Sequence, residues 1–176
     1  MSNLDRYGSA TLPWSRPRDA LAADTPRPDT PFFLGTSRPD GRPHAVGIGA
    51  VWVDGELYFV SGAGTRKSRN LAANPACTIS ARLADIDLVL EGEARTVTDP
   101  ATLERLAAVY RAGGWPAEVD GDAFTAPFSA PSAGPPPWQL YRLTLHTAFG
   151  LATAEPFGAT RWRFAPSAPA TDDVVE

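Results

Sequence analysis

The chain has 176 residues, of which 43% are hydrophobic and 20% charged, and its net charge is −4. This composition fits one soluble globular domain, and the acidic balance excludes nucleic acid as the main partner, because a phosphate backbone needs a basic surface. No apolar run approaches the roughly 20 residues that cross a bilayer, and the N-terminus lacks the basic and apolar regions of a secretory signal. We therefore expect a cytoplasmic protein with no membrane contact, whose single cysteine, Cys77, is a buried apolar side chain in a strand.

Residues 1–13 are predicted to be a flexible leader, followed by a single domain over residues 14–166 and a disordered tail over residues 167–176. Within the domain, the stretch 114–137 is rich in proline, glycine and alanine and is expected to be one long loop. Loops of this length often act as lids or partner contacts, and their tryptophans, such as Trp115, are candidates for shaping a substrate pocket.

The segment "PHAVGIGAVWVDGELYFVSG", residues 43–62, contains two runs rich in Val, Ile, Trp, Tyr and Phe around Asp54-Gly55. An Asp-Gly pair between two such runs is a strong signal for a β-hairpin. The first run carries Gly47 and Gly49, which weaken a strand. They indicate a bulge or a place where another group lies against the backbone, or they ease the curvature of a barrel.

Two or three short helices are predicted, and two of them are indicated by their ends. "TRKSRNLAANP" has Thr65 as its cap and stops at Asn74-Pro75, and "DPATLERLAAVYRAGG" has Asp99 as its cap. The second helix carries an apolar stripe of Leu103, Leu106, Ala107 and Tyr110. About six or seven strands joined mainly by hairpins complete the chain, without alternating β and α segments. This pattern favours an antiparallel barrel or sandwich.

Basic residues crowd the start of the first of these helices, where the helix dipole normally favours acids. Thr65, Arg66, Lys67 and Ser68 combine a helix N-terminus, two cations and hydroxyl donors, which together suit a phosphate. The alternative is a solvated first turn whose cations pair with nearby carboxylates. A P-loop is excluded, because Ser61 and Arg66 stand where that motif needs glycines.

The order "RPDGRPHAVGIGAVWVDGELYFVSGAGTRKSRNLAANPACTISA", followed by "VLEGEARTVTD" and a helix, resembles the pyridoxamine-5′-phosphate-oxidase-like split-barrel superfamily of flavin and deazaflavin oxidoreductases. The resemblance implies a mainly β fold, a six-stranded antiparallel split barrel with a few short helices, and a homodimer with the cofactor at its interface. It also implies that Thr65, Arg66 and Lys67, with Ser68 at a usually small position, grip the cofactor phosphate.

By the same resemblance, the cofactor ring lies along the strand that contains Val46, Gly47, Ile48 and Gly49, and Ser61 lines the site from the neighbouring strand. Phe149, Arg161 and Trp162 are the candidates for groups brought to the partner's site. Vitamin B6 oxidation is not expected, because the ring-binding strand has no cation after His44 and "ATRWRF" has no histidine.

Coenzyme F420 is the expected cofactor, with FMN as the alternative. F420 continues beyond its phosphate into a chain of carboxylates, and Arg38, Arg42, Arg66, Lys67 and Arg69 could form the basic groove that such a chain needs. We therefore expect an oxidoreductase that transfers hydride between the cofactor and a small planar or conjugated acceptor. The alternatives are an FMN-dependent oxidoreductase or flavin reductase, and a non-catalytic protein that binds or stores the cofactor. No metal site and no catalytic side chain is assigned.

Overall fold

The computed structural model describes residues 1–25 and 31–165. The helices are α1 (Ser15–Asp24), α2 (Arg66–Ala73) and α3 (Pro100–Ala112), with one 3₁₀ turn, η1 (Pro131–Ala133). The strands are β1 (Ser2–Asn3), β2 (Phe32–Ser37), β3 (Pro43–Ile48), β4 (Ala50–Val53), β5 (Glu56–Gly62), β6 (Ala76–Arg82), β7 (Ile86–Val97), β8 (Glu118–Asp120), β9 (Ala123–Thr125), β10 (Trp138–Ala152) and β11 (Ala159–Arg163).

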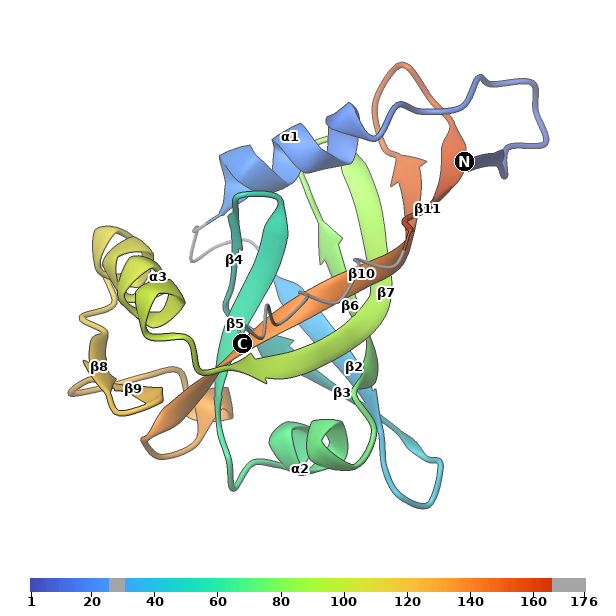
Figure 1. The fold of residues 1–176 in the computed structure, drawn as a ribbon. Helices are drawn as coiled ribbons and strands as arrows, with labels where there is room; N and C mark the ends of the chain where they lie inside the picture. The colour runs from blue at the N-terminus through green and yellow to red at the C-terminus, as the bar shows by residue number, and fades with distance from the viewer. Residues whose placement is uncertain (26–30, 166–176) are drawn as a thin grey trace, which may run out of the picture.

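Six strands form an antiparallel split barrel (Figure 1), as the sequence predicted. β3 and β4 are two parts of one strand that is interrupted at Gly49. β3 pairs with β2, whereas β4 pairs with β5, so the chain leaves one half of the barrel and enters the other at this glycine. The ring β4–β5–β10–β7–β6–β2–β3 is therefore joined at that point by the chain itself and not by a hydrogen-bonded ladder.

The β4–β5 hairpin turns at Asp54 and Gly55, which both have positive φ angles of 53° and 85°. This backbone matches the right-handed twist of the flanking strands, which explains the strength of the Asp-Gly signal. β5 is apolar on both faces because both faces are covered. Leu57 and Phe59 belong to the cluster inside the barrel, and Tyr58 belongs to a second cluster outside it, under α3.

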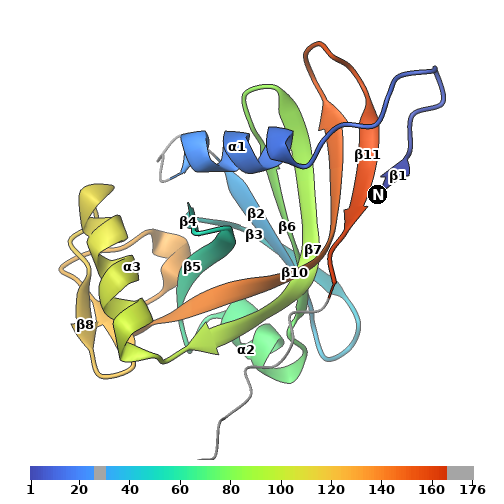
Figure 2. The same ribbon diagram turned by 45° about the horizontal axis from the view of Figure 1, so that its top comes forward.

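The three helices close different sides of the barrel. α1 crosses one end and α2 lies at the opposite end, while α3 flanks the β4–β5 side (Figures 1 and 2). α3 begins as predicted, because the Asp99 carboxylate accepts a hydrogen bond of 2.8 Å from the Thr102 N–H and Pro100 occupies the first turn. The predicted stripe of Leu103, Leu106, Ala107 and Tyr110 is the buried face of this helix.

Residues 1–13, expected to be a flexible leader, contact the domain at two places. β1 pairs with β11, and the Leu12 N–H donates to Thr160 Oγ1 at 2.8 Å. Leu12 is 2% exposed and belongs to the main core cluster, so its burial holds the segment in place. The predicted tail, residues 167–176, lies outside the described residues.

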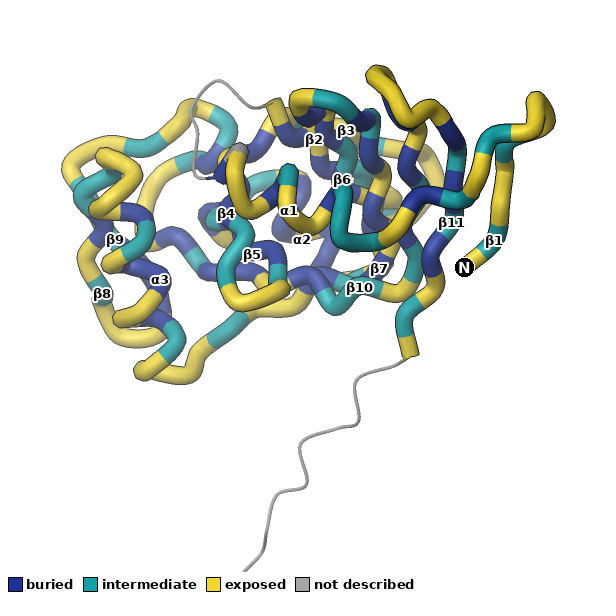
Figure 3. The backbone as a smooth tube through the Cα atoms, turned by 90° about the horizontal axis from the view of Figure 1, so that it is seen from above, coloured by how far each residue is buried: buried dark blue, intermediate teal, exposed yellow. Residues whose placement is uncertain are grey.

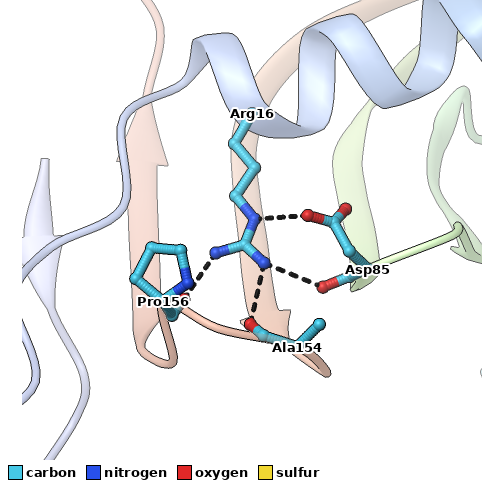
Figure 4. A network of polar contacts seen from close by, with 4 residues as sticks. All are labelled: Arg16, Asp85, Ala154 and Pro156. Carbon is cyan, nitrogen blue, oxygen red and sulfur yellow. Dashed lines mark hydrogen bonds and ion pairs between the residues drawn. The ribbon is translucent and has the colours of Figure 1, made fainter.

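Arg16, in the first turn of α1, joins the helix to two turns of the sheet (Figure 4). Its Nε is 2.8 Å from Asp85 Oδ2, and its terminal nitrogens donate to the carbonyls of Ala154 and Pro156 at 2.9 and 2.5 Å. The side chain is 11% exposed, so these charge-assisted hydrogen bonds are partly shielded from water. They fix α1 across the end of the barrel.

The stretch 114–137 has more structure than the predicted long loop. β8 and β9 form a hairpin in which Phe124 is fully buried, and η1 follows it. Trp115 contacts Tyr110 and Phe124 edge to face, and its indole N–H donates to the Phe128 carbonyl at 2.6 Å. Seen from above, α3, β8 and β9 form one flank of the molecule, and β11 and β1 form the other (Figure 3).

Candidate functional site

The predicted hydroxyl groups meet at the start of α2. Thr65 caps the helix, since its Oγ1 accepts from the Ser68 N–H at 3.3 Å. The Oγ atoms of Ser61 and Ser68 are 2.9 Å apart, and Thr65 Oγ1 lies 2.9 Å from the first and 3.0 Å from the second. Ser61 and Ser68 are buried. β5 and α2 thus bring three of the predicted residues into one hydroxyl cluster.

The basic residues of α2 have no acidic partner among residues 1–25 and 31–165. Arg66 is exposed, and the Arg69 guanidinium donates to the Gly64 carbonyl at 2.5 Å. Lys67 is buried, and its ammonium donates to the carbonyl of Ser132 in η1. Burial lowers the pKa of Lys67, because a neutral carbonyl compensates its charge less well than a carboxylate does. Among the described residues, no acid therefore neutralises this first turn.

Arg38 and His44, from β2–β3, extend this positive region. Arg38 Nε and His44 Nδ1 are buried and have no hydrogen-bond partner in the part of the chain that the structure describes. The pKa of His44 is lowered, first by burial and then by the charges of Arg38, Arg66 and Lys67. We call Arg38, His44, Arg66 and Lys67 the cationic cluster.

Two of the five cations expected to form a basic groove lie outside the cationic cluster. Arg42 forms an ion pair of 2.6 Å with Asp40, and Arg69 is engaged by the Gly64 carbonyl. Buried polar groups without partners are uncommon in folded proteins. Unpaired nitrogens beside uncompensated charges are the chemistry expected of an anion site.

A cavity of about 710 Å³ adjoins this region, and we call it the β3–α3 cavity. Gly47, Ile48 and Gly49 line one side of it, as predicted for residues along a cofactor ring. A Cβ atom added to Gly47 or to Gly49 would meet no atom within 4 Å, so these glycines leave open space against the backbone. Val46 packs against the core cluster inside the barrel and does not line the cavity.

The opposite side of the cavity comes from residues that sequence reasoning did not assign to the site, except that the loop containing Trp115 was a candidate wall. They lie on α3 and in the stretch 114–137 and include Tyr110, Trp115, Phe128 and Ser132. Tyr110 was predicted only as part of the apolar stripe of α3. The available signal was the concentration of aromatic side chains just before and within the long proline-rich stretch.

η1 connects the cationic cluster to the cavity. Ser132 and Ala133 line the cavity, and the Ser132 carbonyl also accepts from Lys67. The loop passes so close to β5 that a Cβ on Gly62 would stand 2.9 Å from the Ala133 oxygen and 2.7 Å from the Pro135 oxygen. Only glycine fits at this position without a shift of the backbone. The cationic cluster and the apolar cavity are therefore two neighbouring parts of one region.

Arg161 and Trp162 do not reach this region within one chain. The Trp162 side chain is buried, contacts Trp14 and donates its indole N–H to the Leu12 carbonyl at 3.1 Å, so it is a core residue here. Arg161 lies on β11 opposite Phe149, and its Nε is buried without a partner among the described residues. A contribution of either residue to a partner's site stays a prediction.

Other kinds of site find little support in residues 1–25 and 31–165. They contain no group of three or more His, Cys, Asp or Glu side chains placed to hold a metal ion. None of their helices is long and apolar enough to cross a membrane. Cys77 is buried, as predicted, and burial raises the pKa of its thiol to about 12, so the reactive thiolate is disfavoured.

The fold is the split β-barrel of the pyridoxamine-5′-phosphate-oxidase-like superfamily. The family model described as pyridoxamine 5′-phosphate oxidase matches residues 19–152, and the chain belongs to this family. No curated protein matches the chain in sequence.

Several solved structures share the fold. An FAD-binding protein of Mesorhizobium loti is 19% identical with a TM-score of 0.55, over 80% of this chain and 95% of that one. General Stress Protein 26 of Bacillus anthracis is 14% identical with a TM-score of 0.55, over 85% and 99%. A heme binding protein of Mycobacterium smegmatis is 16% identical with a TM-score of 0.56, over 88% and 60%.

Proposed function

We propose that this chain binds a phosphate-bearing, flavin-type cofactor and acts as an oxidoreductase that transfers hydride between it and a small planar or conjugated acceptor. The observation that carries the proposal is the cationic cluster, in which Arg38 Nε and His44 Nδ1 are buried without a hydrogen-bond partner among the described residues, beside a cavity walled by Gly47 and Gly49. Membership of the family and the FAD-binding relative of the same fold support a flavin-type group.

Different residues of the site would contact different parts of the cofactor. Arg66 and the free N–H groups of the first turn of α2 face the phosphate, with Thr65 fixing that turn. Lys67 contributes charge, since an ammonium has three N–H donors and the Ser132 carbonyl takes one. The open backbone at Gly47 and Gly49 accepts a flat ring. When bound, the cofactor supplies the hydride chemistry, while the protein orients it and excludes water.

We propose F420 as the cofactor, with FMN as the alternative. The cationic cluster extends beyond α2 to Arg38, at the end of β2–β3, which is more positive charge than a single phosphate requires. A cofactor with carboxylates beyond its phosphate would pair with that additional charge.

Titration of the full chain with F420 and with FMN, followed by cofactor fluorescence, tests this assignment. We expect F420 to bind the more tightly. Arg38→Ala should weaken F420 about tenfold, the loss of one charge-assisted contact, and should change FMN less than about twofold. Equal losses for both cofactors would contradict a contact between Arg38 and the carboxylate chain.

Turnover separates the enzyme from a non-catalytic binder. Reduced cofactor should be oxidised in the presence of planar acceptors at a rate proportional to the amount of protein. Tight cofactor binding without turnover on any acceptor would favour storage or transport of the cofactor.

We also propose that the protein is a homodimer. On the outer face of the sheet, paired residues form a row that runs from Gly47 through Phe33 and Val89 to Phe149 and Arg161. Phe33 is 51% exposed, and an exposed apolar surface of this kind commonly marks an interface. A twofold axis near the middle of the row would place the Arg161 end of one copy over the Gly47 end of the other.

A further inference from the structure

The β3–α3 cavity carries information about the substrate that the cationic cluster does not. Eighteen described residues line it, and none of them has a charged side chain. The polar groups among these eighteen side chains are the hydroxyls of Ser129, Ser132 and Tyr110 and the indole N–H of Trp115. The indole already donates to the Phe128 carbonyl. Transfer of an ion into such surroundings is unfavourable, because no opposite charge would replace its water.

Tyr110 is the unusual residue of this wall. Its side chain is 8% exposed, and its hydroxyl has no hydrogen-bond partner in residues 1–25 and 31–165. Trp115 and Phe124 contact the Tyr110 ring edge to face, with centroids 5.2 and 6.0 Å away, so aromatic rings surround it on the α3 side. Burial raises the pKa of this phenol, which therefore stays protonated and able to donate.

The cavity divides by chemistry into two ends. The glycine end, at Gly47 and Gly49, offers bare backbone and stands nearer in sequence to the cationic residue His44. The aromatic end, at Tyr110, Trp115 and Phe128, offers aromatic rings, and the Tyr110 hydroxyl is buried at this wall without a partner among the described residues. The cavity volume of about 710 Å³ lies in the upper part of the range of about 300–1,000 Å³ usual for ligand pockets.

We propose that the aromatic end of the β3–α3 cavity binds an uncharged, largely apolar aromatic substrate that carries a carbonyl or similar acceptor, and that the Tyr110 hydroxyl donates to this acceptor. This inference rests on the proposed function only in naming the ligand a substrate; the binding itself needs no cofactor. The cavity should bind an anionic substrate poorly, because the positive charges lie in the cationic cluster and not among the residues that line the cavity.

Three fluorescent probes built on naphthalene test the charge requirement with the full chain. N-phenyl-1-naphthylamine is neutral, and 1-anilinonaphthalene-8-sulfonate is the same molecule with one sulfonate. Prodan is neutral and carries a carbonyl. The two neutral probes should bind saturably, one per chain, and the sulfonate at least about tenfold more weakly. Sulfonate binding as tight as that of its neutral counterpart, or no saturable binding of prodan, would overturn the proposal.

Two tyrosine variants test the hydroxyl. Tyr110→Phe keeps the ring and should weaken prodan about fivefold or more and shift its emission to shorter wavelength, with less than about twofold change for N-phenyl-1-naphthylamine. The matched control is Tyr58→Phe, because Tyr58 belongs to the same apolar cluster but its hydroxyl donates to Glu56 and it does not line the cavity. Equal losses of both probes in both variants would refute the role of Tyr110.

Repetition of the prodan titration with saturating cofactor separates this inference from the proposed function. Prodan should bind the loaded protein with similar affinity. Displacement of the cofactor by prodan, mole for mole, would refute a separate substrate end. Failure of every cofactor to bind, with prodan binding and its dependence on Tyr110 intact, would refute the cofactor proposal and leave the ligand class of the cavity standing.

Discussion

Arg66 and Arg42 carry the same charge, but only one of them is available to a ligand. The Arg42 guanidinium is held by Asp40 at 2.6 Å, whereas Arg66 has no ion pair among the described residues and contributes to the lowered pKa of His44. Asp40 offsets the charge of Arg42 in this pair, although an exposed ion pair of this kind adds little to stability. Partners, and not charge alone, decide which cations form the site.

Substitution of Arg66 tests the phosphate contact directly. Arg66→Ala should weaken both F420 and FMN by about 10- to 150-fold, the loss of a charge-assisted hydrogen bond, and leave the thermal midpoint nearly unchanged because the side chain is exposed. Arg69→Ala, on the same helix but bound to the Gly64 carbonyl, is the control and should change either affinity less than about threefold. Unchanged affinity in the Arg66 variant would refute the phosphate site.

His44 should make anion binding depend on pH. Its pKa lies below the usual 6.5 because of burial and three neighbouring cations, and a bound anion offsets those charges and raises the pKa again. Binding therefore takes up a proton, and affinity rises as the pH falls through the pKa of the bound state. Sulfate, which stays a dianion over this range, should bind about three- to tenfold more tightly at pH 5.5 than at pH 7.5 in thermal-shift titrations.

His44→Asn should abolish this pH dependence, and His146→Asn should preserve it, because His146 is exposed on β10 and is not among the groups that interact with His44.

Without an anion, the lowered pKa of His44 makes the folded protein less stable at acidic pH. The unfolded chain takes up a proton before the folded one as the pH falls through 6.5, so this residue destabilises the fold progressively at acidic pH. If the parent protein binds sulfate with the same affinity at every pH, His44 does not contribute to the anion site.

At the scale of elements, Arg16 adds polar contacts with the sheet to the burial of Leu21 on the same helix. Arg16→Ala would break the contacts with Asp85, Ala154 and Pro156 together, and should lower the free energy of unfolding by about 1.5–3 kcal/mol in urea denaturation. Arg18→Ala, on the same helix, removes only an exposed pair with Asp19 and should cost less than about 0.5 kcal/mol. Similar losses in the two variants would mean that the Arg16 contacts contribute no more than a surface ion pair.

Elements with local signals were predicted, and elements that depend on distant pairing were not. Asp54-Gly55, the caps at Thr65 and Asp99, and the stripe of α3 all act within a few residues, and the structure confirms them. β1 has two residues and forms only because β11 lies beside it, which nothing in residues 1–13 reveals. The β8–β9 hairpin did have a signal, since its turn contains Asp120-Gly121, but the surrounding prolines suggested a plain loop.

At the scale of the whole molecule, the outer row predicts the oligomeric state. Val89 and Leu151 are 36% and 54% exposed on neighbouring strands, β7 and β10. The double variant Val89→Asp, Leu151→Asp should convert the dimer to a monomer in sedimentation velocity, because buried carboxylates without partners are strongly unfavourable. Phe157→Asp, equally exposed at 54% but in the turn before β11, should remain dimeric. A monomeric parent protein would refute the proposed pairing.

Part of the candidate site was predictable, because some of its residues are close together in the sequence. The hydroxyls and cations of residues 61–68 are close in sequence, so their meeting follows from one strand, one turn and one helix. The approach of Ser132 to Lys67 joins residues 65 positions apart, and Arg38 and His44 reach α2 only through the pairing of β2 with β3. Contacts of this kind depend on the path of the whole chain, which periodicity and capping signals do not specify.

The interruption of the strand at Gly49 allows β3 and β4 to move relative to each other while the sheets on either side stay folded. Because no ladder joins β3 to β4, rotation of the backbone at Gly49 can change the angle between them without breaking an inter-strand hydrogen bond at this seam. We therefore expect that a ring bound beside Gly47 leaves the amide protons of β6 and β7 as protected from exchange with deuterium as in the protein alone.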